Sequence, residues 1–412
     1  MGILLSMAYR NLFRNKRRSL LAASSVMFSI TLIVFMQGFY GGFMDSIIRN
    51  ATRQESGHIK ITTKEYSENE RFLPVNKLVD DPGRIAAAVA ADRSLSRDIA
   101  LVTERIRFGV LLNNRDRSVP GLCIAGDITN ETKMLMLNKA ITAGRYLSAE
   151  RDVIVGEALA RSLGISVGSN LVLMTEGSDG SLRVRRFSIV GLFKTGAVGL
   201  DKMLFQVSIN DARKLLRAGK RTQEIIIMLN DYRNSAAVGA RLEKKLKDDT
   251  LAVLPWQTKS EIGRLAQFMT ATYNIMYFVI ALLGAFIITN VIMMVVLERK
   301  REIGIMKAMG FSRAEILGLF LSEGVLLGAA GSIAGSALGL LITGLLMIKG
   351  VDLGSASSAL GNFPLDTVIF PTVSLFSVLT ACVLGAVTAA IVSFLPASRA
   401  ASMAPIDAIK SV

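Results

Sequence analysis

The sequence predicts an α-helical membrane protein with four transmembrane helices and a large α+β extracytoplasmic domain inserted between the first and second helices. Hydrophobic residues make up 51% of the 412 positions and the mean hydropathy is +0.44, as in integral membrane proteins. Four apolar runs contain no charged residue and are long enough to cross a bilayer; they are 19–44, 265–297, 324–348 and 372–395. About 220 residues separate the first two runs, which is ample for one or two hydrophobic cores.

The segment before the first run, 1–18, places basic residues among apolar ones, with Lys16, Arg17 and Arg18 next to the run itself. A helix of this composition is expected to lie on the cytoplasmic leaflet as an interfacial helix. Because basic flanks stay on the cytoplasmic side, the N-terminus is predicted inside and the first transmembrane helix, 19–44, leads outward. The run is too long for the apolar part of a signal peptide, so no cleaved leader is expected.

Strand and helix signals alternate through the extracytoplasmic domain, 45–267, which predicts an α+β fold. The predicted strands are 57–63, 99–112, 118–125, 152–155, 171–175, 182–192, 205–209, 224–229 and 251–254, and the predicted helices are 82–91, 157–163, 211–216 and 235–246. The segments that join the domain to the membrane keep a helical apolar pattern. A helix over 256–297 would be about 60 Å long, twice the ~30 Å of a bilayer core. We therefore expect both flanking helices to continue beyond the membrane as a stalk.

The later boundaries follow from the other apolar runs. They are the second transmembrane helix 268–297, a charged segment 298–314, the third helix 315–348, an outer loop 349–371, the fourth helix 372–396 and a tail 397–412. The charged segment and the tail are predicted to be cytoplasmic because of their basic excess, and Pro396 is expected to end the fourth helix. In the third helix Gly331, Gly335 and Gly339 recur every four residues. This spacing lets another helix approach closely, in the same chain or in another.

The charged segment 298–314 has the pattern of a short amphipathic helix. Ile303, Met306 and Met309 recur at helical spacing and form one apolar edge. Gly310 suits the end of this helix, and Ser312 followed by Glu315 predicts a capping box at the start of the next one. An ordinary cytoplasmic loop would have the same composition, so composition alone does not separate a loop from a docking helix.

The order of residues in this segment adds a resemblance. The stretch E-R-K-R-E-I-G-I-M-K-A-M-G-F-S-R-A-E-I at 298–316 closely resembles the signature that follows the second transmembrane helix of FtsX-like ABC permeases. That family includes the lipoprotein-releasing (Lol) and macrolide-export (MacB) systems. Shorter stretches of the chain resemble the family as well: A-Y-R-N-L-F-R-N-K-R-R-S at 8–19, V-I-V-G-E-A-L-A-R-S-L-G-I-S-V-G-S at 153–169 and P-A-S-R-A-A-S-M-A-P-I-D-A-I-K at 396–410.

The resemblance implies a cytoplasmic coupling helix that sits in a groove of an ATPase. The residues assigned to this coupling are Glu298, Arg301, Glu302, Gly304, Met306, Lys307, Ala308 and Gly310. It also implies a porter-like periplasmic domain interrupted by an inserted subdomain, which we place at about 120–200 by analogy with the family. The implied partners are two copies of an ATPase, which bind the ATP and Mg²⁺, and a second permease chain, identical or paralogous. The implied location is a bacterial inner membrane.

The sequence argues against several other functions. It has no G-x-x-x-x-G-K-[ST], H-E-x-x-H or G-x-S-x-G motif, so the chain is not expected to be an enzyme or to bind a cofactor of its own. One histidine, His58, and two separated cysteines, Cys123 and Cys382, predict neither a metal site nor a disulfide. The net charge of +15 is spread over the large domain and the membrane flanks, which argues against nucleic-acid binding. Glu323 is the exceptional ionisable residue in the spans, too few for a proton relay.

Two classes of function fit these features. The first is a permease that extracts or moves an amphiphile with energy from a partner ATPase, by Lol-type lipoprotein release or by MacB-like efflux of amphiphiles or peptides. The second is FtsX-like transmembrane signalling to a cell-wall hydrolase. The size of the extracytoplasmic domain favours transport, because FtsX-type domains are smaller. MacB-type exporters carry a fused N-terminal ATPase, and its lack here favours the Lol type.

A lipoprotein permease needs an apolar surface that receives acyl chains from the outer leaflet, and a periplasmic acceptor that takes the cargo. Extracting a chain costs about 0.8 kcal/mol per CH₂. Aromatic residues and methionine at the outward ends of the two stalk helices suit this role. The residues predicted for this surface are Phe35, Met36, Phe39, Phe268, Met269 and Met276. Contact with bulk lipid or packing between helices is the alternative for each of them.

Overall fold

The computed structural model describes residues 7–11, 16–114, 117–196, 198–258, 261–352 and 368–402. The chain divides into two compact units. The described residues of the membrane unit fall within Met1–Ser46, Gln267–Leu353 and Thr367–Val412, and those of the soluble unit fall within Ile47–Ala266. The expected insertion of a folded domain between the first and second transmembrane helices is confirmed.

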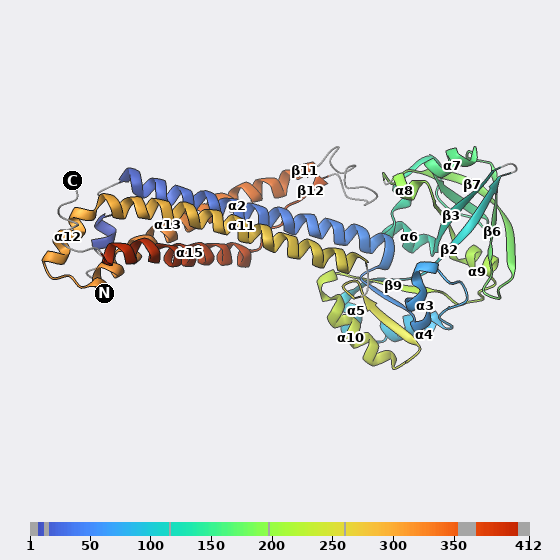
Figure 1. Cartoon of the computed structure of the whole chain (residues 1–412). Coiled ribbons are helices and arrows are strands. Elements are labelled where there is room, and N and C mark those ends of the chain that lie inside the picture. The colour runs from blue at the N-terminus through green and yellow to red at the C-terminus, as the bar shows by residue number, and fades with distance from the viewer. Residues whose placement is uncertain are drawn as a thin grey trace. The chain divides into compact units, whose positions relative to one another are not determined.

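Four long helices contain the predicted membrane spans (Figure 1). They are α2 (Lys16–Ala51), α11 (Glu261–Glu298), α13 (Arg313–Lys349) and α15 (Leu375–Ser402). The apolar, helix-length windows within them are Ser19–Ala51, Gly263–Glu298, Arg313–Lys349 and Val378–Ser402. At 36 and 38 residues, α2 and α11 are about 54 and 57 Å long. Both therefore exceed the ~30 Å of a bilayer core, as the sequence predicted.

Two of the differences from the predicted helix boundaries lie at the two ends of the membrane unit's sequence, at the start of α2 and at the end of α15. α2 begins at Lys16, inside the segment assigned to the interfacial helix, of which 7–11 are helical while 1–6 and 12–15 lie outside the described residues. The prediction that Pro396 ends the fourth helix is wrong, because α15 continues through it to Ser402. A proline removes only one backbone donor, and the buried Ala397 and Ala400 beyond it pack in the membrane unit. Of the tail, 403–412 lies outside the described residues.

The outer loop is closed by a short hairpin. Strand β11 (Val351–Asp352) pairs antiparallel with β12 (Val368–Ile369), and 353–367 lies outside the described residues. Just after the hairpin, Thr372 N–H donates to Gly38 O at 2.9 Å. This bond ties the segment that follows β12 to α2.

Glycines let α13 lie directly against α2 in the membrane unit. A Cβ added at Gly331 would lie 2.6 Å from Val26 Cβ, and one at Gly335 would lie 2.5 Å from Met27 O. A Cβ at Gly339 would lie 2.8 Å from Val34 Cβ. Thr31 Oγ1 also donates to Gly335 O at 3.1 Å. The four-residue glycine stripe thus faces a helix of the same chain.

The soluble unit is built on one mixed sheet of ten strands. The strand order is β10 (Leu251–Pro255), β1 (Ile59–Thr63), β9 (Glu224–Leu229), β2 (Ile99–Asn114), β3 (Arg117–Gly126), β8 (Leu204–Ser208), β5 (Asp152–Gly156), β7 (Leu182–Phe193) and β4 (Ile141–Gly144). Strand β6 (Asn170–Glu176) pairs with both β2 and β7. The pairs β3–β8 and β5–β7 are parallel and the others are antiparallel. The nine strands predicted from sequence are present, and the short β4 was missed.

Two groups of helices accompany the two halves of this sheet (Figure 1). Helices α3 (Lys64–Asn69), α4 (Pro82–Ala90), α5 (Arg93–Asp98) and α10 (Ser235–Leu246) lie with β10, β1 and β9. Helices α6 (Ile128–Met134), α7 (Glu157–Leu163), α8 (Val198–Asp201) and α9 (Ile209–Leu216) lie with β3, β5, β7 and β8. The first core takes its buried residues from 59–95 and 225–251, whereas the larger second core is built almost wholly from 106–218. The insert placed at 120–200 falls within this second half.

Candidate functional site

The charged segment forms helix α12 (Lys300–Ala308) between α11 and α13 (Figure 1). Met309 caps the helix, and Gly310 follows with φ +96°, a left-handed conformation that glycine adopts readily. The predicted capping box at the start of α13 is confirmed. Ser312 Oγ accepts the N–H of Glu315, and Glu315 Oε2 accepts the N–H of Ser312 at 2.8 Å. The turn between α12 and α13 is therefore tightly specified.

The apolar edge predicted for this helix does not form one exposed face. Ile303 is fully buried in the core of the membrane unit. Met306 is partly buried against the same core, whereas Met309 is 67% exposed. The reason is that α12 lies on the ends of the other helices and uses part of its apolar edge for internal packing. Ile305, which the sequence analysis passed over, is 46% exposed and belongs to the outward face.

The structure sorts the predicted coupling residues by exposure. Those exposed are Glu298, Arg301, Ala308 and Gly310, those partly buried are Glu302, Met306 and Lys307, and Gly304 is buried. A residue that docks on another protein has to reach solvent in the free chain. The outward face of α12, which we define as Arg301, Ile305, Ala308 and Met309, therefore meets that requirement and Gly304 does not.

A buried ion pair ties the start of α12 to α13. Arg299 Nη1 donates to Glu323 Oε1 at 2.9 Å and to Oε2 at 3.1 Å, and Arg299 Nε donates to Glu302 Oε2 at 2.8 Å. Asn11 Nδ2 donates to the same Glu323 Oε1 at 2.8 Å. Arg299 and Glu323 are 9% and 7% exposed. Glu323 was predicted as an exceptional charge in the spans without a partner, although a carboxylate in an apolar run calls for a nearby cation.

A second polar contact ties the other end of α12 to α15. Lys307 Nζ donates to the carbonyl oxygen of Ala401 at 2.8 Å. Ala400 and Ala401 are buried in the same core as Ile303. The coupling segment is thus held against two transmembrane helices of its own chain and against Asn11 of the N-terminal segment.

The residues predicted for the substrate surface lie on α2 and α11. On α2, Phe35 and Phe39 are partly buried and stack with ring centroids 6.2 Å apart, as part of a ladder that continues to Phe43. Met36 is also partly buried. On α11, Phe268 is 64% exposed. The other two are Met276, 45% exposed, and Met269, partly buried. The exposed apolar area is therefore concentrated on α11.

Tyrosines outside the predicted surface join α2 to α11. The rings of Tyr40 and Tyr273 stack with centroids 4.2 Å apart, and Tyr40 OH donates to Thr270 Oγ1 at 3.0 Å. Tyr277 lies one turn further on, with its ring centroid 6.3 Å from that of Tyr273. The apolar ring and polar hydroxyl of tyrosine suit the boundary between apolar and aqueous regions.

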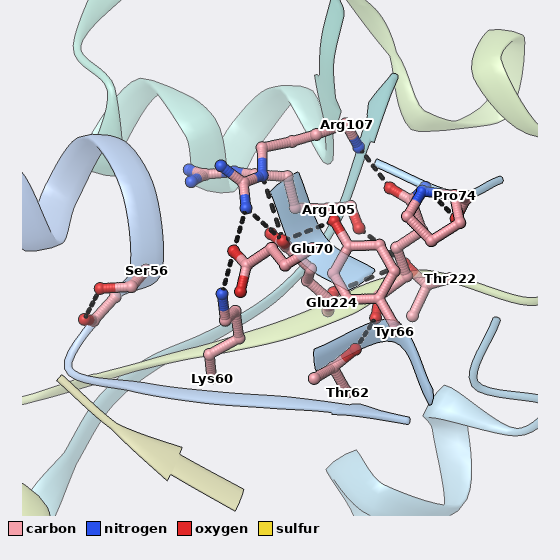
Figure 2. Close-up of polar contacts among 12 residues, drawn as sticks. Ser56, Lys60, Thr62, Tyr66, Glu70, Pro74, Arg105, Arg107, Thr222 and Glu224 are labelled. Atoms are coloured by element: carbon pink, nitrogen blue, oxygen red, sulfur yellow. Dashed lines mark hydrogen bonds and ion pairs between the residues drawn. The ribbon is translucent and has the colours of Figure 1, made fainter. Parts of the chain in front are cut away.

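The soluble unit contains a buried ionic network that joins β1, β2 and β9 (Figure 2). Arg107 on β2 donates to Glu224 Oε1 at 2.7 Å and to Glu70 Oε1 at 2.6 Å, and Lys60 pairs with the same Glu70. Tyr66 OH donates to Glu224 Oε1 at 3.1 Å. Burial raises the pKa of Glu224, but the charges of Arg107 and Lys60 outweigh burial and hold that pKa below its usual range. This network fastens the three strands together.

Comparison with known proteins agrees with this architecture. The model of the MacB-like periplasmic core domain matches residues 19–245, and the model of the FtsX-like permease C-terminal region matches 274–405. The lipoprotein-releasing system transmembrane protein LolC of Neisseria meningitidis serogroup B is 26% identical over 324 residues, covering 76% of this chain and 73% of the relative. LolC of Xylella fastidiosa (strain Temecula1) is 24% identical with the same coverage.

A macrolide export ATP-binding/permease protein, MacB of Nitrobacter winogradskyi, is 38% identical over 130 residues. That match covers 31% of this chain and 17% of the relative. The first family model covers more than half of the chain, and the second covers the region that contains α12 and the last two transmembrane helices. The chain therefore belongs to the FtsX-like ABC transporter permeases that carry a MacB-like periplasmic core domain.

Proposed function

We propose that this chain is the permease subunit of a Lol-type ABC transporter, which releases lipoproteins from the inner membrane with energy from a separate cytoplasmic ATPase. The observation that carries the proposal is the extent of the match to LolC. It covers 76% of this chain, whereas the match to the MacB exporter covers 31%. The similarity to LolC is long enough to extend over both the soluble unit and the membrane unit. A release cycle has to connect these two parts.

The outward face of α12 is the proposed contact with the ATPase. It presents one cation, Arg301, beside the apolar Ile305, Ala308 and Met309, a composition suited to a protein groove. The basic excess of this segment favours a cytoplasmic position, with both termini on the same side. Two ATPase copies, which hold ATP and Mg²⁺, and a second permease chain complete the proposed complex.

The exposed aromatic and methionine side chains at the start of α11 are the proposed receiving surface for acyl chains. Each buried CH₂ of a lipid anchor is worth about 0.8 kcal/mol, so extraction needs both work from ATP and an apolar surface. Phe268 and Met276 supply exposed apolar area, and the thioether of methionine adapts to irregular chains.

Reconstitution tests the proposal directly. The chain, its ATPase and the second permease are placed in liposomes with a triacylated lipoprotein, and transfer to a soluble acceptor is measured. Release that requires ATP supports the proposal. ATP-dependent efflux of small amphiphiles without lipoprotein release would instead identify a MacB-like exporter, and activation of a cell-wall hydrolase without release would identify an FtsX-like signalling protein.

The proposed receiving surface has a matched control on the same helix. Phe268 and Phe286 are 64% and 60% exposed, and they lie about 27 Å apart along α11. Phe268→Ala is expected to lower release per ATP severalfold, whereas Phe286→Ala, nearer α12, should leave it unchanged. Equal effects of the two variants would show that the outer end of α11 has no special role.

A further inference from the structure

We propose that Arg299 and Glu323 form the joint through which the coupling helix α12 moves transmembrane helix α13. This inference rests on the proposed function, because it assigns to α12 a partner ATPase that drives it. It adds a positioning role for two residues that face the interior of the chain and therefore cannot contact the ATPase.

Helix α12 is attached to α13 at both of its ends. At its C-terminal end the turn through Gly310 and the capping box of Ser312 fix the chain. At its N-terminal end Arg299 reaches Glu323 across 24 positions of sequence. The path from Arg299 to Met309 and the path from Arg313 to Glu323 are each about 15 Å as helix. The two helical segments, which are of similar length, and the ion pair therefore close a triangle.

A closed triangle transmits rotation, whereas a helix attached at one end swivels. The guanidinium of Arg299 is held from two sides, by Glu302 on α12 and by Glu323 on α13. It also lies over the ring of Phe320, with Cζ 5.6 Å from the ring centroid. Burial makes separation costly, because the Glu323 carboxylate would lose the cation that neutralises it in a buried site. A tilt of α12 therefore has to carry Glu323 with it.

The same carboxylate reaches a third element. Asn11 donates to Glu323 Oε1, the atom that also accepts from Arg299. Asn11 belongs to the N-terminal segment that precedes α2, the helix against which the glycines of α13 lie. Movement at Glu323 is thus passed to the N-terminal segment as well as to α13.

Replacing both partners of the ion pair with apolar residues distinguishes two roles. If the pair only stabilises the fold, the double variant keeps its function; if the pair transmits movement, the double variant is stable but loses coupling. A single substitution at either partner of a buried ion pair lowers stability in both cases, because the remaining buried charge loses one of its interactions. Replacing both partners with apolar residues of similar volume removes that penalty. Arg299→Met combined with Glu323→Leu is therefore expected to recover stability while lacking the directional bond that the triangle needs.

The experiment measures lipoprotein released per ATP hydrolysed in the reconstituted complex. The double variant should bind the ATPase and unfold at the wild-type temperature, yet release at least tenfold less lipoprotein per ATP. Glu323→Gln, which keeps the shape of the side chain, should also reduce this ratio. Lys300→Gln, which removes a neighbouring charge outside the pair, should leave it unchanged. A stable double variant with the wild-type ratio would overturn the inference.

A second measurement separates failure of the inference from failure of the proposed function. Spin labels at Ile305→Cys on α12 and Val325→Cys on α13 use exposed positions, in a Cys382→Ala background that leaves only the buried Cys123. In the permease alone the distance distribution should be narrow, and it should broaden in the double variant. An unchanged distribution contradicts the joint even if wild-type protein releases lipoprotein. A broadened one supports it even if the cargo proves to be another amphiphile.

Discussion

Arg105 and Glu131 form a two-point ion pair in the interior of the soluble unit. Arg105 Nε donates to Glu131 Oε1 and Nη2 to Oε2, each at 3.0 Å, and both side chains are 0% exposed. Arg105 comes from β2, which runs through both halves of the sheet, and Glu131 comes from α6. Fork-to-fork geometry makes this one of the stronger kinds of ion pair. It fixes α6 on the sheet.

Glu131→Gln should lower the free energy of unfolding of the soluble unit by about 3–5 kcal/mol, because it breaks a fully buried ion pair by removing the carboxylate charge that faces Arg105. Glu150→Gln is the control, since its pair with Lys214 leaves the two side chains 67% and 50% exposed. Its effect should stay below about 1 kcal/mol. Fluorescence of Trp256, the single tryptophan of the chain, follows unfolding in the full-length protein. Equal effects would contradict the prediction.

The single histidine should make stability depend on pH. Burial lowers the pKa of His58 from 6.5 to about 4, and its Nδ1 accepts the N–H of Leu229 at 2.9 Å. The unfolded chain therefore binds the proton more readily than the folded one. Stability should be full above about pH 6.5 and fall by about 3 kcal/mol as the pH drops toward 4.

Selective histidine labelling allows NMR to follow this group alone in the full-length protein. The folded protein should titrate near pH 4, and His58→Gln should remove the loss of stability between pH 6.5 and 4. Titration of the folded protein near 6.5 would contradict the burial argument.

The glycine stripe predicts that two substitutions on the same helix, α13, differ sharply in their effect on stability. A Cβ at Gly335 would lie 2.5 Å from the backbone oxygen of Met27, whereas one at Gly344 meets nothing within 4 Å. Gly335→Val should therefore separate α13 from α2 and lower the unfolding temperature in detergent by several degrees, whereas Gly344→Val should not. A null effect of Gly335→Val would mean that the two helices are not in close contact in the membrane.

The outward face of α12 predicts where the ATPase binds. Met309→Asp or Ala308→Trp should abolish co-purification of the ATPase and substrate-stimulated ATP hydrolysis, because each changes the shape or polarity of an exposed docking residue. Met203→Asp, at an exposed methionine of the soluble unit, is the control. Substitution of Gly304 is a poor test, since this residue is buried and a larger side chain would disturb packing within the chain. Normal ATPase binding by both α12 variants would place the docking site elsewhere.

The sequence was informative wherever one local signal decides the structure. Runs without charge located the four membrane helices, and the spacing of Ser312 and Glu315 located the start of α13. Short elements such as α5, α6 and β4 were missed because four to seven residues hold too little periodicity. The prediction that Pro396 ends the fourth helix was wrong because tertiary packing of the alanines beyond it outweighs one lost hydrogen bond. The face that α12 presents, and the pairing of Arg299 with Glu323, depend on contacts across distant sequence and could not be read locally.

The topology of the soluble unit also dictates an order of folding. Strand β1 pairs only with β9 and β10, so its hydrogen-bonding partners follow it by roughly 160 residues or more. Most of the second core comes from the intervening 106–218, which can collapse as soon as it is synthesised. The first core cannot form until its second group of residues, 225–251, has been synthesised. Both edges of β1 are therefore open while 106–218 emerges, which is the interval in which this protein is most exposed to mispairing and aggregation.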